Sequence, residues 1–313
     1  MDMDVRPEIR SLGRRSTIRV TGVTALAVVL VIVLSAAPVS AISFANSSPA
    51  PERTEVGFLG IVVDVDGDGI LDTLGPSCSG TMIDSDTFLT AAHCTDNFPS
   101  GQHFFVSLEE DILSLVIAGA GLPTDEFIKL GLANGWIAEG DMYRHSAFPG
   151  NPGFPNGADQ HDMAVIDFAD RDTTPPDLWT FTPAVLPTAG QLDEIGRHGL
   201  GGYDWWVVGY GVQEAAPGPG GLTHPGGLVR RKAPVDFLSL NMSWVNLAMN
   251  ASRDLGGVCY GDSGGPNYVD IDGTLVLAGV TSWGDYPCYA TDFAYRTDTP
   301  SARAFLADFV DLP

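Results

Sequence analysis

The chain has 313 residues, of which 16 are Lys or Arg and 39 are Asp or Glu, so its formal net charge is −23. This acidic excess argues against binding to nucleic acids or to anionic membranes, because both carry charge of the same sign, and it fits a soluble exported protein. The length suffices for one large hydrophobic core or two small ones.

The first 41 residues have the pattern of a secretory signal. Arginines precede an apolar run at 25–34, and the small residues Val39-Ser40-Ala41 follow at the positions that a signal peptidase reads. We therefore predict that residues 1–41 are a signal peptide, cleaved after Ala41, and that the protein is secreted. The alternative is an uncleaved signal anchor, for which the apolar run is short.

Strands are predicted from Val56 onward, after a lead at 42–55 that is rich in Ser, Pro, Ala and Asn. We interpret this lead as a flexible segment or a propeptide. A β-branched and apolar run at 56–65 is followed by the turn residues Asp66-Gly67-Asp68-Gly69, and 70–74 could return as the second strand of a hairpin.

The acidic residues of this turn have a second interpretation. Asp64, Asp66, Asp68 and Asp72 have the spacing of ligands in an EF-hand calcium loop, but the twelfth position is Gly75 rather than a bidentate Glu. A calcium loop and a plain acidic hairpin tip both remain open.

Two segments of the first half end on residues that can take part in acid–base chemistry. Residues 77–92 predict a strand, a turn and a strand, with His93 at the end. The Pro- and Gly-rich segment 145–157 predicts a loop that leads to Asp162, which precedes an apolar run. His145 and His161 have no surrounding motif, so we interpret both as surface or loop histidines.

The remaining elements follow from hydrophobic periodicity and composition. A Pro- and Thr-rich segment at 170–187 predicts a crossing between two halves, and the basic run Arg230-Arg231-Lys232 predicts a solvated strand edge. The apolar spacing at 301–310 predicts a helix. Further strands are predicted at 104–108, 113–117, 205–211 and 275–283.

The stretch Gly261-Asp262-Ser263-Gly264-Gly265-Pro266 can present a nucleophile. A serine is a useful nucleophile only on a tight turn, beside a base and facing donors for the negative charge that it creates. Gly261 would let its own N–H and that of Ser263 point at one oxyanion, and Asp262 could order the loop by pairing with a buried cation. By itself the stretch is equally compatible with an ordinary Gly/Ser/Asp turn.

Together with Leu89-Thr90-Ala91-Ala92-His93-Cys94 and with the segment that begins His161-Asp162, this stretch resembles the trypsin/chymotrypsin family of serine endopeptidases. The resemblance covers residues 56–313. It implies an all-β fold of two six-stranded antiparallel Greek-key barrels with a C-terminal helix. It also implies a triad of His93 as base, Asp162 as its orienting group and Ser263 as nucleophile, with the N–H groups of Gly261 and Ser263 as the oxyanion hole. The spacings within the triad are longer than is usual in the family, so we expect loop insertions.

The same resemblance selects one of the three pairings that four cysteines permit: Cys78 with Cys94, and Cys259 with Cys288. It further implies that Ser282, Trp283 and Gly284 pair an extended substrate as an added strand. Gly257 stands at the pocket floor, where trypsin-like members have an acid. We hypothesise that Asp292 on the pocket wall supplies the missing charge; the alternative is an uncharged pocket. No Ile-Val-Gly-Gly N-terminus is present, so the activation route stays open.

The sequence as a whole predicts a secreted, monomeric serine endopeptidase that cleaves polypeptides through an acyl-enzyme intermediate. We expect no cofactor or metal in the reaction, no nucleic-acid partner and no stable membrane association after signal removal. The alternatives are a non-catalytic binding protein on the same scaffold and an esterase with the same triad.

Overall fold

The computed structural model describes residues 46–75, 78–96, 102–150, 159–169, 179–218 and 220–313. Contacts divide the chain after Pro38, and all described residues belong to the unit that runs from Val39 to Pro313. The predicted signal peptide lies outside the described residues. Among the residues described, no helix is long and apolar enough to cross a membrane.

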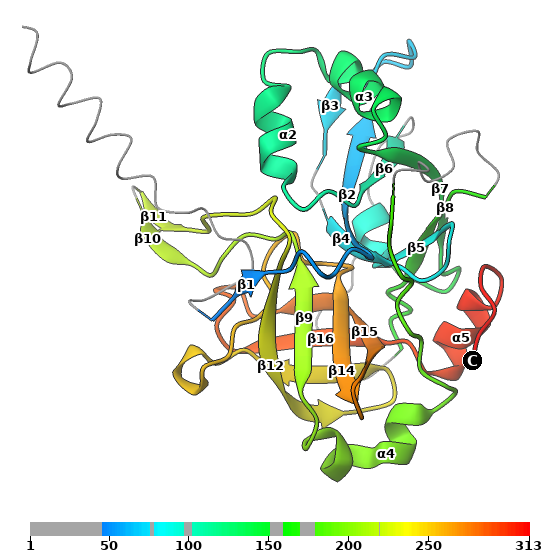
Figure 1. Cartoon of the computed structure of the whole chain (residues 1–313), viewed down its shortest axis with the longest axis vertical. Coiled ribbons are helices and arrows are strands. Elements are labelled where there is room, and N and C mark those ends of the chain that lie inside the picture. Colours follow the sequence, from blue (N-terminus) through cyan, green and yellow to red (C-terminus); the bar gives the residue numbers. More distant parts are fainter. Residues whose placement is uncertain (1–45, 76–77, 97–101, 151–158, 170–178, 219) are drawn as a thin grey trace, which may run out of the picture. The chain divides into compact units, whose positions relative to one another are not determined.

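The first half forms a closed six-stranded antiparallel barrel (Figure 1). A short strand, β3 (Thr73–Leu74), extends it by pairing with the end of β2, which confirms the predicted hairpin. Around the barrel the strands are β2 (Val56–Val63), β4 (Cys78–Met82), β5 (Thr87–Thr90), β8 (Ala164–Asp167), β7 (Ala138–Arg144) and β6 (Gln102–Ser107), and β6 closes onto β2.

The second half repeats this order. Its strands are β9 (Trp205–Gly209), β12 (Arg231–Leu240), β13 (Trp244–Ala248), β16 (Thr291–Arg296), β15 (Thr274–Gly284) and β14 (Pro266–Ile271), and β14 closes onto β9. In both barrels the strands, numbered along the chain, pair in the order first, second, third, sixth, fifth, fourth, which is a Greek-key arrangement. The predicted fold of two six-stranded antiparallel barrels is confirmed.

The barrels enclose apolar side chains because alternate residues of each strand point inward. The first barrel buries residues such as Leu59 and Phe88, and the second buries Val207 and Leu247, all with at most 1% of their surface exposed. Gly80 faces this packing directly, since an added Cβ would lie 2.3 Å from the Phe88 ring.

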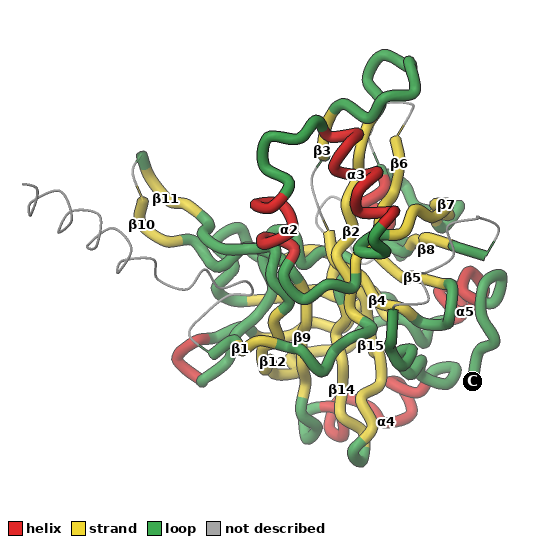
Figure 2. The backbone as a smooth tube through the Cα atoms, turned by 45° about the horizontal axis from the view of Figure 1, so that its top comes forward, coloured by secondary structure: helices red, strands yellow, loops and turns green. Residues whose placement is uncertain are grey.

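The helices are short and lie around the strands (Figure 2). The predicted C-terminal helix is present as α5, where the Thr299 side chain accepts a hydrogen bond from the N–H of Ala302 and so caps the helix. The strand predicted at 113–117 is wrong: this segment lies in helix α2, and Asp111 caps it by accepting from Ser114 N–H. The helices are η1 (Ala92–Thr95), α2 (Ile112–Ala118), α3 (Thr124–Ala133), α4 (Gln191–Leu200), η2 (Ala251–Arg253) and α5 (Pro300–Leu306).

The basic run at the start of β12 holds residues 47–56 by hydrogen bonds and is not a solvated edge. Arg230 is 3% exposed and donates to the carbonyls of Ala50, Val56 and Leu108. Its neighbour Arg231 donates to Ser47. Beside them, β1 (Ser48–Pro49) pairs with β12, so residues assigned to a flexible lead are held in the second sheet. A two-stranded hairpin, β10 (Ala216–Gly218) with β11 (Gly221–Thr223), stands apart from both barrels.

Candidate active site

The loop that carries Ser263 is a tight turn held by its own backbone. Asp262 N–H donates to Cys259 at 3.0 Å, and Gly265 N–H donates to Asp262 at 2.9 Å. Gly261 has a φ of 97°, in the region that favours glycine. Gly264 has a φ of 82°, and a Cβ there would lie 2.1 Å from Thr90 Oγ1, so no larger residue fits the turn.

The N–H groups of Gly261 and Ser263 are free to bind a ligand. Neither donates a hydrogen bond to any residue that the structure describes, whereas those of Asp262, Gly264 and Gly265 all do. Ser79 on β4 fixes the loop from the first barrel, with its N–H on the Ser263 carbonyl at 2.8 Å and its hydroxyl on the Gly261 carbonyl at 2.9 Å. The N–H groups of Gly261 and Ser263 are thus two nearby donors that can bind one negatively charged oxygen.

Asp262 lies beneath this loop and has no exposed surface. Its carboxylate accepts from the N–H groups of Gly211 and Cys259, both at 2.8 Å. Burial raises the pKa of Asp262 to about 7, although the two N–H bonds oppose the shift. The described residues place no basic side chain in ion-pair contact with it, so the predicted cation partner is not found among them.

His93 and Asp162 form a hydrogen-bonded pair at the edge of the first barrel. His93 lies in η1, and Asp162, which is fully buried, lies just before β8. The Asp162 carboxylate contacts His93 Nδ1 at 2.8 Å, accepts from the His93 N–H at 2.9 Å, and accepts from the hydroxyl of Ser282 on β15. The imidazole therefore has a fixed tautomer, with the proton on Nδ1 and Nε2 available as a base.

The pKa values of this pair move apart because of these contacts. Burial alone would lower the pKa of His93, but the charge of Asp162 and the hydrogen bond to it outweigh burial and raise that pKa. Burial opposes the charge on Asp162, yet His93 and Ser282 hold its pKa below the usual value. The arrangement stabilises an imidazolium beside a carboxylate.

His93 and Ser263 line one cavity of about 340 Å³. Within the described part of the chain no hydrogen bond joins the Ser263 hydroxyl to the imidazole, a contact that in unliganded enzymes often tightens only when substrate binds. The predicted substrate-pairing residues Ser282, Trp283 and Gly284 line the same cavity. Its other lining residues are Val258, Cys259, Tyr260, Thr281, Asp285 and Cys288.

Gly257 and Asp292, predicted at the floor and wall, are not among the lining residues. A Cβ at Gly257 would lie 2.1 Å from Met249 Sδ, so Met249 occupies the space beside it. Asp292 has no exposed surface. The Asn267 side-chain amide, oriented so that its oxygen accepts from Thr281, donates to Asp292 Oδ2 at 2.7 Å. Burial and then the charge of Asp262 raise the pKa of Asp292 well above its usual value. The Asp292 carboxyl is therefore buried and does not line the cavity of His93 and Ser263.

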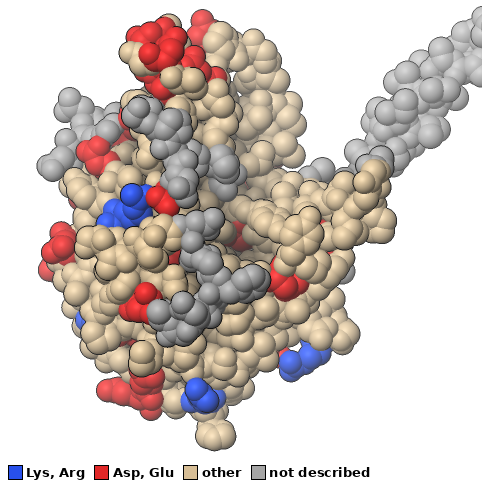
Figure 3. All heavy atoms as spheres, turned by 180° about the vertical axis from the view of Figure 1, so that it is seen from behind, with Lys and Arg blue, Asp and Glu red and all other residues tan. Residues whose placement is uncertain are grey.

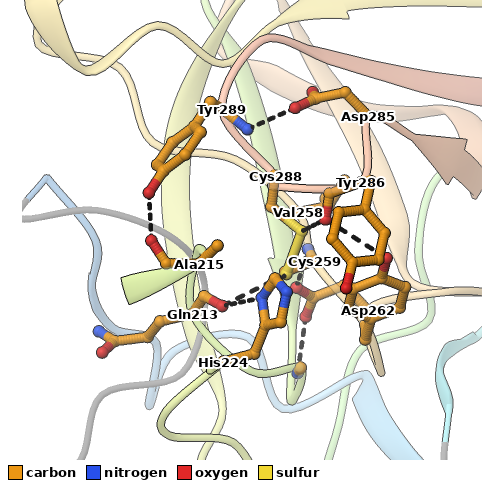
Figure 4. The surroundings of a disulfide bond; sticks show 12 residues. Gln213, Ala215, His224, Val258, Cys259, Asp262, Asp285, Tyr286, Cys288 and Tyr289 are labelled. Carbon is orange, nitrogen blue, oxygen red and sulfur yellow. Dashed lines mark hydrogen bonds between the residues drawn. A yellow bond between two sulfur atoms is a disulfide. The ribbon is translucent and has the colours of Figure 1, made fainter. Parts of the chain in front are cut away.

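Both disulfides expected from the resemblance are present, Cys78–Cys94 beside His93 and Cys259–Cys288 beside the cavity. Figure 4 shows His224 against the second disulfide, 3.4 Å from Cys259 Sγ through Nδ1, with Tyr286 next to it. Tyr260, Tyr286 and His224 form edge-to-face contacts with centroids 5.0 to 6.2 Å apart. Sequence reasoning missed this aromatic cluster, because its members come from three separate loops.

The acidic turn after β2 gathers the carboxylates of Asp64, Asp66 and Asp72 within 4.8 Å of one another. Both oxygens of Asp64 accept hydrogen bonds from the loop itself, from the N–H groups of Gly67 and Gly69. A calcium loop and a plain acidic hairpin tip are both compatible with this geometry. The face shown in Figure 3 carries more acidic than basic side chains, in keeping with the net charge.

No family model matches the chain. Vitamin K-dependent protein C of Rattus norvegicus is 22% identical over 241 residues, which are 75% of this chain and 46% of that protein. Vitamin K-dependent protein C of Mus musculus is 24% identical over 243 residues, with the same shares of 75% and 46%. The chain thus spans about half the length of the curated relatives that it matches. In fold and in sequence, the chain is thus distantly similar to the trypsin-like serine proteases.

Proposed function

We propose that the chain is a secreted serine endopeptidase in which Ser263 is the nucleophile, His93 the base and Asp162 the group that orients His93. Residues 1–41 would be the signal peptide, 42–55 the lead and 56–313 the protease domain. The observation that carries the proposal is the convergence on one cavity of Ser263 and of His93, held by Asp162. In addition, the N–H groups of Gly261 and Ser263 donate no hydrogen bond to any described residue and lie next to the nucleophile.

In the proposed reaction Ser263 Oγ attacks the carbonyl carbon of a peptide bond while its proton passes to His93 Nε2. The resulting oxyanion accepts hydrogen bonds from the Gly261 and Ser263 N–H groups. The C–N bond then breaks, the leaving amine takes the proton from His93, and an acyl group remains on Ser263. Water next attacks this ester, gives its proton to His93, and releases the carboxylic acid as the Ser263 hydroxyl re-forms.

The test is covalent labelling of the secreted protein with a fluorophosphonate, read by mass spectrometry beside the Ser263→Ala variant. We expect one adduct, on Ser263, and none on the variant, because an isolated serine hydroxyl is too weak a nucleophile to react. The intact mass in the same spectrum gives the N-terminus that accompanies activity. Absence of labelling in a correctly folded wild-type protein, before and after limited proteolysis, would favour the non-catalytic binding protein.

A further inference from the structure

Two histidines and a serine outside the cavity form a hydrogen-bonded chain beside Asp162. Ser301, in the first turn of α5, lies between them: its Oγ is 2.8 Å from His161 Nδ1 and 3.2 Å from His145 Nε2. The two imidazole rings stack with centroids 4.5 Å apart and planes 22° apart. Both histidines flank the carboxylate along the backbone, because His161 precedes Asp162 and the His145 N–H donates to the Met163 carbonyl at 3.0 Å.

With both imidazoles neutral, the contacts allow an arrangement of hydrogens in which Ser301 both accepts and donates. Ala147 N–H donates to His145 Nδ1 at 3.2 Å, so this nitrogen is an acceptor and the neutral ring carries its proton on Nε2. That proton is then donated to Ser301 Oγ, and the Ser301 hydroxyl in turn donates to His161 Nδ1. In this arrangement the Ser301 hydroxyl accepts from one imidazole and donates to the other, so it links the two rings.

The backbone at His161 needs such support. Its φ is 50°, a left-handed conformation that residues other than glycine adopt at a cost. Its N–H donates to Asp159 Oδ1 at 3.0 Å, and its carbonyl accepts from Met163 N–H at 2.8 Å. Asp162 therefore stands at the centre of a tight turn, and the conformation of His161 sets the direction of the Asp162 carboxylate.

Several polar or charged groups face the histidine pair from the packed elements. The Asp159 carboxylate is 3.5 Å from His161 Nδ1, and Tyr295 on β16 donates to the same oxygen at 2.7 Å. Arg144 and Asp308 line a neighbouring cavity together with His145. Burial, and then the charge of His161, lower the pKa of His145 against the opposing effects of Ser301 and Asp159. The His145 ring therefore stays neutral to a lower pH than an ordinary histidine.

We propose that Ser301 and His145 are positioning residues for the reaction: they hold His161 in its strained conformation and thereby aim Asp162 at His93. This role rests on the proposed function, since it acts through the His93–Asp162 pair. Neither residue lines the cavity that holds Ser263, so neither touches the reacting atoms.

The experiment measures the rate constant for fluorophosphonate labelling of Ser263 between about pH 5 and about pH 9, across the range in which histidines titrate. For Ser301→Ala we expect the plateau rate constant to fall by about 10- to 100-fold, because Asp162 is misaligned. The acid limb should also move to lower pH, because a misplaced Asp162 no longer raises the pKa of His93. Ser301→Thr, which keeps the hydroxyl, and Ser146→Ala, on the exposed neighbour of His145, should leave both quantities unchanged.

The outcomes separate the two proposals. A Ser301→Ala profile equal to wild type, or lower by the same factor at every pH with an unmoved midpoint, overturns the positioning role while the proposed function stands. If the wild type is not labelled, the proposed function fails. The role is then judged from the downfield proton resonance of the His93–Asp162 hydrogen bond, which needs no turnover. This resonance should shift in Ser301→Ala, and an unchanged resonance overturns the positioning role.

Discussion

The hydroxyl of Ser282 connects the two barrels at the scale of a single residue. It donates to the carboxylate of Asp162, which comes from the first barrel, while Ser282 itself belongs to β15 of the second. A hydrogen bond to a charged group is worth about 1.5 to 3 kcal/mol, which exceeds a typical neutral bond. The Ser282 side chain is thus part of the machinery that holds His93.

We predict that Ser282→Ala lowers the rate constant for fluorophosphonate labelling by about tenfold, because the Asp162 carboxylate loses a donor and is less firmly oriented. Alanine keeps the backbone groups that would pair a substrate. Ser85→Ala, at the exposed β4–β5 turn, is the matched control and should label like wild type. Equal rates for wild type and Ser282→Ala would contradict a role for this hydroxyl.

At the scale of the element, two arginines at the start of β12 hold the segment that precedes β2. The buried Arg230 donates hydrogen bonds to three backbone carbonyls and forms no ion pair with a described carboxylate. Arg231, in contrast, is half-buried and donates to Ser47. Both arginines anchor the segment before β2 to the second barrel. Replacing the buried Arg230 would remove the donor of the Leu108 carbonyl and one of the two donors of the Ala50 and Val56 carbonyls.

We therefore predict that Arg230→Met lowers the free energy of unfolding by about 3 kcal/mol, because several hydrogen bonds from a buried charged group are lost and the Leu108 carbonyl loses its donor. Arg231→Met should cost about 1 kcal/mol or less, since water can replace its bonds. Denaturant unfolding of the two variants beside wild type gives both values. Similar costs for the two substitutions would mean that the burial of Arg230 has no energetic weight.

The elements also show where sequence reasoning succeeds and where it stops. The Ser263 loop was predictable because its glycines are required by close approach, as the 2.1 Å clash at Gly264 demonstrates. The α2 segment was not, because residues 113–117, of which four are apolar and one is Ser114, fit a strand and a helix equally well and only the Asp111 cap decides. The His145–Ser301–His161 chain carries no motif, since its members are up to 156 residues apart and meet only in the folded chain.

At the scale of the whole molecule, stability depends on pH through buried carboxyls. Asp262 has a raised pKa of about 7, so the folded protein binds a proton there that the unfolded chain releases at a lower pH. The free energy of unfolding should accordingly fall as pH rises from about 4 to about 7. Asp292, also buried and with its pKa raised, contributes in the same direction.

We predict that Asp262→Asn, which cannot ionise, flattens this decline between about pH 4 and about pH 7 in denaturant unfolding at fixed ionic strength. The readout is the slope of the free energy of unfolding against pH, not its absolute value, because one of the two N–H donors to Asp262 loses its acceptor in the variant. Asp308→Asn, at an exposed position, should keep the wild-type slope. A wild-type stability that rises with pH through Asp262 would reveal a cation next to this carboxylate.

The contacts between residues 47–56 and the start of β12 have a kinetic consequence. The Arg230–Ala50 contact joins residues 180 positions apart, whereas the β14–β15 hairpin joins neighbours. Chain segments close in sequence meet first during folding, because closing a long loop costs more entropy. The segment that leads into β2 is therefore among the last to be protected from hydrogen exchange. During folding, its amide hydrogens should still exchange with solvent after the amide hydrogens of both barrels have become protected from exchange.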